Sequence, residues 1–108
     1  MKKATVIFPA YNDFEWLNKQ LVEVVGDFEI IIVDNSERPL YQNPPFGTTY
    51  LHGFRYVLNG FAKQLRMCPS MMRELGWQYA TTDMVIFVPV GTTLRKGWFE
   101  KYKATGKF

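Results

Sequence analysis

The chain has 108 residues, a length that suits one domain over residues 1–108. Hydrophobic residues make up 47% of it and aromatic residues 17%, which excludes a disordered chain and provides enough apolar side chains for a core. The formal net charge of +3 comes without a long basic run. This excludes a dedicated nucleic-acid binder but suits a small anionic ligand such as a diphosphate.

Cysteine usage and hydropathy indicate the compartment. The single cysteine, Cys68, excludes a disulfide within the chain, fits a reducing environment and is expected to be a small packing residue. No run approaches the roughly 20 apolar residues of a membrane span. Lys2 and Lys3 precede an apolar run, but this run is too short for a signal peptide. We therefore expect a cytoplasmic protein without a transmembrane segment.

The first half of the chain predicts a strand, a helix and a second strand. The apolar run Thr5–Phe8 predicts the first strand, and Asn12 or Asp13 is expected to cap the helix that follows. Gly26 is expected to end that helix, before the central strand Phe28–Val33. One buried stripe recurs at helical spacing along the helix, formed by Phe14, Leu17, Leu21 and Val24.

The second half continues the alternation of strands and helices. Prolines in residues 37–47 predict a loop. The elements expected after it are an edge strand at Thr48–Leu51, a helix at Asn59–Met67 that stops before Pro69, a helix at Ser70–Ala80, a strand at Met84–Val88 and a helix at Arg95–Tyr102. This order predicts an α/β fold, a three-layer α/β/α sandwich with a mostly parallel sheet. Most aromatic side chains, Trp77 included, are expected in the core.

Polar residues follow the first two predicted strands directly. Tyr11 and Asn12 come after the first strand, and Asp34 and Asn35 come after the second. Ligands bind beyond the carboxyl ends of parallel strands, so we expect these side chains to share one site. The alternative is that Asn12 and Asp34 only cap a helix and a turn.

Four segments resemble the family-2 glycosyltransferases of the GT-A fold, in a register close to the rhamnosyltransferase-like branch. They are Ile7-Phe-Pro-Ala-Tyr-Asn12, Ile32-Val-Asp-Asn-Ser36, Asn59-Gly-Phe-Ala62 and residues 83–99. The resemblance spans nearly the whole chain, but it covers only the amino-terminal, nucleotide-binding half of such an enzyme. It implies a GT-A or Rossmann-like half domain, without the acceptor half, and the strand order 3-2-1-4.

The resemblance also implies which residues bind a nucleotide. Pro9 and Tyr11 would flank the base, and Asn35 stands at the position of the acid that contacts it. An amide both donates and accepts hydrogen bonds, so Asn35 can pair with the edge of uracil or thymine. Asp34 would orient the loop or bond to the ribose. The implied ligand is a nucleoside diphosphate sugar of the UDP or dTDP type.

The metal motif of the family is degenerate in this chain. Its Asp-x-Asp carboxylates, which hold a divalent metal, are replaced by Pro89, Val90 and Gly91. Asp83 lies at the other end of the predicted strand, too far away to replace them. We therefore predict no metal and no cofactor. Four cations are candidates to pair with phosphate instead, or are ordinary solvated side chains: Arg55, Lys63, Arg95 and Lys96.

Two functions follow from these patterns. The first is a glycosyltransferase-like domain that binds a nucleoside diphosphate sugar and transfers the glycosyl group only with a partner chain. The family's catalytic base belongs to a later segment, and the lone His52 is expected to be structural, so the catalytic residues are unknown. The alternative is a non-catalytic interaction module that binds a second copy or a partner protein. Its contact would be an exposed patch of Trp98, Phe99 and Tyr102.

Overall fold

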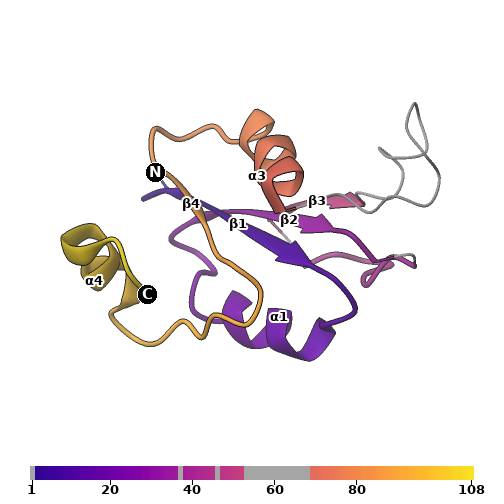
Figure 1. Cartoon of the computed structure of the whole chain (residues 1–108), viewed down its shortest axis with the longest axis horizontal. Helices are drawn as coiled ribbons and strands as arrows, with labels where there is room; N and C mark the ends of the chain where they lie inside the picture. Colours follow the sequence, from indigo (N-terminus) through magenta and orange to yellow (C-terminus); the bar gives the residue numbers. More distant parts are fainter. Residues whose placement is uncertain (1, 37, 46, 53–68) are drawn as a thin grey trace.

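A computed structural model describes residues 2–36, 38–45, 47–52 and 69–108. Along the chain it contains β1 (Thr5–Ala10), α1 (Phe14–Leu21), β2 (Glu29–Asp34), β3 (Thr48–His52), α3 (Pro69–Gln78), β4 (Val85–Phe87) and α4 (Trp98–Thr105), as Figure 1 shows. The helix expected at Asn59–Met67 lies outside the described residues, as do Arg55, Lys63 and Cys68.

The four strands form one parallel sheet in the order β3-β2-β1-β4, which confirms the predicted fold class and strand order. β1 lies between β2 and β4, with Thr5 beside both Glu29 and Val85. β3 lies at an edge, as expected, and Asp34 is paired with His52 at its end. Because all strands run the same way, their carboxyl ends meet at one edge of the sheet.

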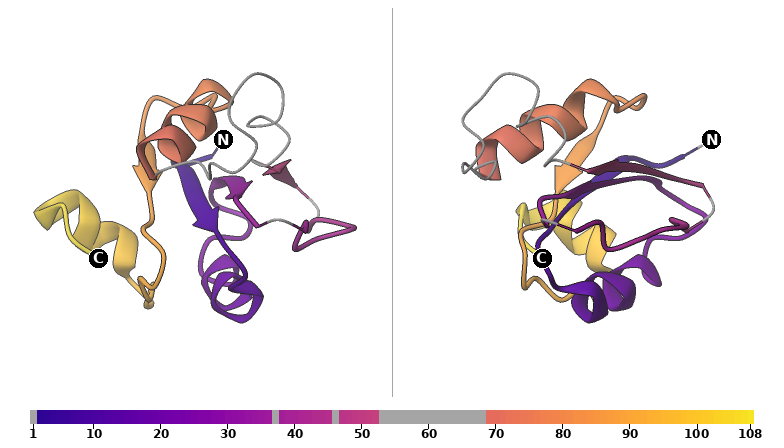
Figure 2. Two further views of the ribbon diagram at one scale, coloured as in Figure 1. Left: turned by 45° about the vertical axis from the view of Figure 1, so that its right-hand side comes forward. Right: turned by 90° about the vertical axis from the view of Figure 1, so that its right-hand side faces the viewer.

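Helices cover both faces of the sheet. α3 lies on one face, whereas α1 and α4 lie on the other (Figures 1 and 2). Side chains of β1 alternate between these faces: Val6 and Phe8 belong to the cluster under α1 and α4, and Ile7 belongs to the cluster under α3. Both clusters are buried, so the domain is the three-layer sandwich that the alternation of elements predicted.

The helix α1 is shorter than predicted. It ends at Leu21 instead of Gly26, because Glu23 and Val24 bond to carbonyls three residues earlier and tighten the chain into turns. Phe14, expected on the buried stripe of this helix, is 45% exposed. The core stripe therefore begins one turn later, at Leu17.

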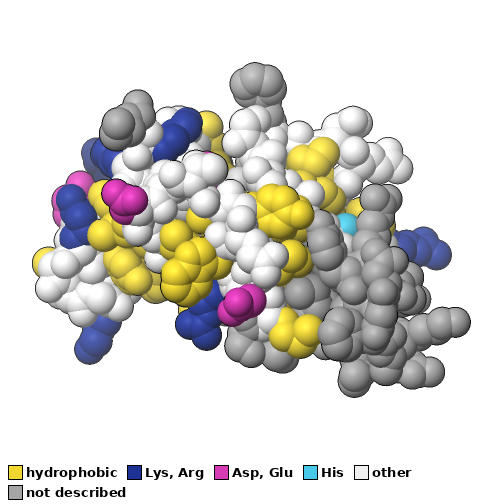
Figure 3. All heavy atoms as spheres, turned by 90° about the horizontal axis from the view of Figure 1, so that it is seen from above, with side chains coloured by type: hydrophobic (Ala, Val, Ile, Leu, Met, Phe, Trp, Pro, Cys, Tyr) yellow, Lys and Arg dark blue, Asp and Glu magenta, His cyan; other side chains and the backbone are white. Residues whose placement is uncertain are grey.

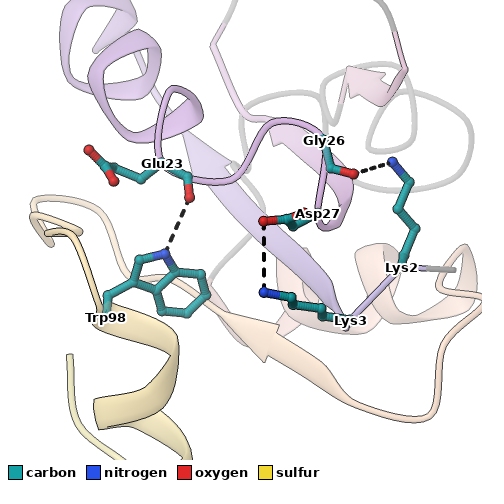
Figure 4. A network of polar contacts seen from close by, with 6 residues as sticks. All are labelled: Lys2, Lys3, Glu23, Gly26, Asp27 and Trp98. Atoms are coloured by element: carbon teal, nitrogen blue, oxygen red, sulfur yellow. Dashed lines mark hydrogen bonds and ion pairs between the residues drawn. The ribbon is translucent and has the colours of Figure 1, made fainter.

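The amino end of α4 is fastened to the turn between α1 and β2 (Figure 4). Trp98 Nε1 donates to the carbonyl of Glu23 at 3.4 Å. The helix starts at Trp98 rather than at the predicted Arg95, since Gly97 has the left-handed φ of 82°. Beside this contact, Lys2 Nζ donates to the Gly26 carbonyl at 3.0 Å, and Lys3 pairs with Asp27 at 3.8 Å.

The prediction of an exposed aromatic patch on the last helix is wrong. Trp98 is 5% exposed and Phe99 8%, because α4 folds back on the sheet and both rings pack on Phe28 at 5.2 and 5.0 Å. Tyr102 is partly buried and stacks on Phe108. Trp98 and Phe99 complete the core, so they offer no docking surface.

Trp77 was predicted to be buried and is instead exposed. Core burial was the expectation for most aromatic side chains, Trp77 included, but 60% of this side chain is exposed on α3. None of the described helices is long and apolar enough to cross a membrane.

Candidate functional site

The chain path creates a switch point between β1 and β4. From β1 it runs to β2 and on to β3, always toward the same side, and then returns to place β4 on the other side of β1. Connections that leave β1 and β4 in opposite directions open a crevice at the carboxyl ends of these strands. Ligands of open α/β sheets bind in such a crevice.

A cavity of about 300 Å³ lies at this position. Its lining comes from the ends of three strands and from one residue of α3: Pro9, Ala10, Tyr11, Asn35, Met72, Phe87, Pro89 and Val90. The structure thus brings together Pro9, Tyr11 and Asn35 of the expected nucleotide site with two residues of the degenerate metal motif. Asn12, Asp34 and Gly91 are not among the lining residues.

The walls of this cavity are mainly apolar. Pro9, Met72 and Phe87 contribute hydrophobic surface, and Asn35 and Tyr11 are the lining residues whose side chains contain polar groups. Asn35 is 9% exposed, and its backbone N–H donates to the Ala10 carbonyl at 2.7 Å, which ties the ends of β1 and β2 together. Apolar walls with one or two polar groups suit a flat ring that has a polar edge.

Asp34 holds the loop after β2 rather than lining the cavity. Its side chain is fully buried, and Oδ1 accepts from the backbone N–H of Ser36 at 2.9 Å. Oδ2 accepts from the backbone N–H of Leu40 at 2.8 Å and from the hydroxyl of Tyr50. Burial, together with the hydrogen bond and the negative charge of Asp34, raises the pKa of Tyr50. Of the two roles expected for Asp34, these contacts match the orientation of the loop.

The turn after β1 is held by backbone groups and by Asp13. Asn12 has the left-handed φ of 55°, and its N–H donates to the hydroxyl of Ser36 at 2.8 Å. Asp13 occupies the N-cap position of α1, but its side chain makes no capping hydrogen bond. Its Oδ1 accepts instead from the backbone N–H of Tyr11 at 2.8 Å, which fixes the residue that lines the cavity.

The turn after β4 does not fit a divalent metal. Pro89, Val90 and Gly91 carry no side-chain oxygen, and Gly91 adopts a left-handed φ of 89°. Within the described ranges, no group of three or more His, Cys, Asp or Glu side chains could hold a metal ion. Hard divalent cations need such oxygen ligands, so the residues of this turn do not suit one.

The other candidate residues lie elsewhere. Arg95 and Lys96 line a separate cavity of about 210 Å³ beside α4. His52 lies at the end of β3, where Nε2 is 2.6 Å from the Ser36 carbonyl and the ring borders a third cavity. These side chains therefore lie outside the cavity that Tyr11 and Asn35 line.

Sequence reasoning missed Ala10, beside the expected Pro9 and Tyr11, and two residues from later in the chain, Met72 and Phe87. Both looked like ordinary core residues, and Met72 is indeed 5% exposed. Met72 reaches the carboxyl ends of the strands because α3 packs on β1 and β2, and no local sequence pattern reports that contact.

No family model matches the chain, and neither a curated protein nor a solved structure matches it.

Proposed function

We propose that the cavity at the carboxyl ends of β1, β2 and β4 binds the base of a nucleoside diphosphate sugar, of the UDP or dTDP type. The observation that carries this proposal is that Tyr11 and Asn35 line one cavity at the switch point of a parallel sheet. The resemblance of the two motifs that contain these residues to those of family-2 glycosyltransferases adds support.

The chemistry of the walls is suited to a pyrimidine base. Pro9 of β1 and Tyr11, which follows this strand, line the cavity together with the apolar Pro89 and Val90 after β4. A planar ring between them gains stacking and excludes water. The Asn35 amide donates and accepts, as the adjacent N–H and carbonyl groups of uracil and thymine require. A guanine base presents a different edge and a larger ring, so it should bind less well.

The proposed role is binding, with glycosyl transfer only in an assembly. Transfer requires a group that stabilises the departing diphosphate and a base that deprotonates the acceptor. The residues that line the cavity carry neither a carboxylate nor a cationic side chain. Residues outside this lining, or a partner chain, would have to provide both groups.

Titration calorimetry with UDP, dTDP and GDP, each with and without Mn²⁺, tests this proposal. We expect UDP or dTDP to bind without a requirement for the metal. Tyr11→Ala should weaken binding by about tenfold or more, since stacking on an aromatic ring contributes about 1–3 kcal/mol per base. Asn35→Leu should remove the preference over GDP.

Tyr79→Ala is the matched control, because Tyr79 is 43% exposed and does not line the cavity. The affinity of this variant for each nucleotide should equal that of the wild type. If none of the three nucleotides bound at millimolar concentration, the proposal would be wrong.

A further inference from the structure

β4 presents one open edge. In the described sheet it has a neighbour on one side only, β1. Its even-numbered residues face β1: the Thr5 N–H donates to the Met84 carbonyl at 2.9 Å, and the Val88 N–H donates to the Ile7 carbonyl at 3.0 Å. The backbone N–H and C=O groups of successive strand residues point to opposite edges of the strand. Those of Val85 and Phe87 therefore point away from β1. Such an edge is a template for another strand.

A groove of about 540 Å³ follows this edge between α3 and α4. Arg73 and Trp77 of α3 border it on one side and Tyr102 of α4 on the other, and Phe87 of β4 and Asp83, which precedes the strand, also line it. Trp77 is the most exposed aromatic side chain among the described residues, and Figure 3 shows hydrophobic side chains at the surface of the face that carries α3. Exposed apolar side chains beside an open strand edge indicate an interaction surface.

We infer that this groove receives a second copy of the chain, through antiparallel pairing of β4 with β4 across a two-fold axis at Ile86. In this register Val85 of each copy lies opposite Phe87 of the other, and each pair exchanges two backbone hydrogen bonds. All outward N–H and C=O groups of Val85 and Phe87 are then satisfied. Pro89 has no N–H to donate, so the pairing ends there.

Charge complementarity favours a second copy over an unrelated strand. The guanidinium carbon of Arg73 lies 5.4 Å from the centre of the Phe87 ring. Asp83 precedes β4 and lines the same groove as Val85 and Phe87. Antiparallel pairing brings Asp83 of one copy diagonally opposite Phe87 of the other, within reach of the Arg73 that covers this ring. The two-fold axis makes this ion pair twice, on a surface that carries both signs of charge.

Sedimentation velocity over a concentration series tests the inference. With few backbone bonds and a small groove, we expect a weak, concentration-dependent dimer of the wild type. Asp83→Arg and Arg73→Asp should each weaken self-association by about tenfold or more, because each places like charges together. An equimolar mixture of these two variants should associate like the wild type, since both ion pairs are restored in the mixed dimer. The matched control is Glu15→Arg, a charge reversal on the exposed side of α1, which should change nothing.

Hydrogen exchange gives a readout that does not depend on any variant. The amides of Val85 and Phe87 should exchange more slowly as the wild-type concentration rises, whereas other exposed amides should not. The proposal is overturned by a wild type that stays monomeric at all concentrations, which would leave the groove to another kind of partner. A dimer that is insensitive to both reversals, or a mixture that does not recover, would also overturn it.

Discussion

At the residue scale, the turn after β2 depends on one buried carboxylate. Sequence reasoning allowed Asp34 either to contact a ligand or to orient the loop, because short polar residues after a strand serve both uses. Complete burial and the bonds to the backbone N–H groups of Ser36 and Leu40 match the second use. The neighbouring Asn35 lines the cavity, so this loop also sets the polar edge of the candidate site.

Replacing Asp34 by asparagine tests this role. An amide has one acceptor oxygen, and its NH₂ group would face a backbone N–H or the Tyr50 hydroxyl. We expect Asp34→Asn to lower the free energy of unfolding by about 2 kcal/mol, the range for hydrogen bonds to a charged group. Urea denaturation measures this change. The control is Asp27→Asn, at an exposed carboxylate that pairs with Lys3, which should cost less than about 1 kcal/mol. Equal effects in the two variants would contradict the assigned role.

Glu29, at the opposite end of β2, provides a pH-dependent prediction. Burial raises the pKa of Glu29, but the hydroxyl and backbone N–H of Thr81 and the hydroxyl of Thr5 lower it, and the lowering prevails. The folded pKa is thus below the ordinary value of 4.5. The carboxylate stabilises the fold above that pH and loses this contribution as the pH falls through the folded pKa.

We therefore expect Glu29→Gln to lower the free energy of unfolding near neutral pH. The difference in the free energy of unfolding between Glu29→Gln and the wild type should shrink as the pH falls below 4.5, the ordinary pKa of the carboxyl group. Urea denaturation at a series of pH values measures the difference. A constant difference across the series would show that the ionised form of Glu29 is not what stabilises the fold.

At the element scale, α3 lies close to β1 because one of its residues has no side chain. A Cβ at Gly76 would lie 2.7 Å from Cγ2 of Ile7 and 3.0 Å from its Cδ1. Ile7 is fully buried, and its β-branched side chain has little freedom to move. The backbone of the helix therefore packs directly on the strand. This contact holds Met72 against the sheet, where it lines the cavity.

Gly76→Ala should reveal this close approach. In an unconstrained helix the change stabilises by up to about 1 kcal/mol, because alanine is the better helix former. Here we expect a loss of about 1–3 kcal/mol, typical of an overpacked core. Urea denaturation measures the sign, with Gln78→Ala on the exposed part of α3 as the control. A more stable Gly76→Ala variant would show that α3 does not pack this closely.

Most elements of the fold were predictable from local patterns, but their ends were not. The apolar runs of β1 and β2 are buried on both faces, which is why they were recognisable. β1 extends beyond the predicted Thr5–Phe8 because Pro9 and Ala10 still pair with β2. Pairing with a neighbouring strand decides where a strand ends, and a single segment does not report it.

At the scale of the whole molecule, the predictable part of the site is the part that follows the strand ends. Tyr11 and Asn35 were expected to lie together because the carboxyl ends of parallel strands meet at one end of the sheet, and they line one cavity. Met72 and Phe87 were missed, and Trp98 was misplaced, since an apolar helix face fits a core and a partner equally well. Whether an apolar helix face is buried in the core or left for a partner depends on the face of the sheet on which the helix packs. That is a property of the complete fold.

The most direct test of the proposed site is a titration of the ¹⁵N-labelled chain with UDP, followed by amide chemical shifts. If the carboxyl ends of β1, β2 and β4 form a nucleotide site, the largest shifts fall on Tyr11, Asn35 and Val90, and the amides around Lys96 stay in place. Shifts confined to the cavity beside α4, or no shifts at saturating nucleotide, would contradict the account.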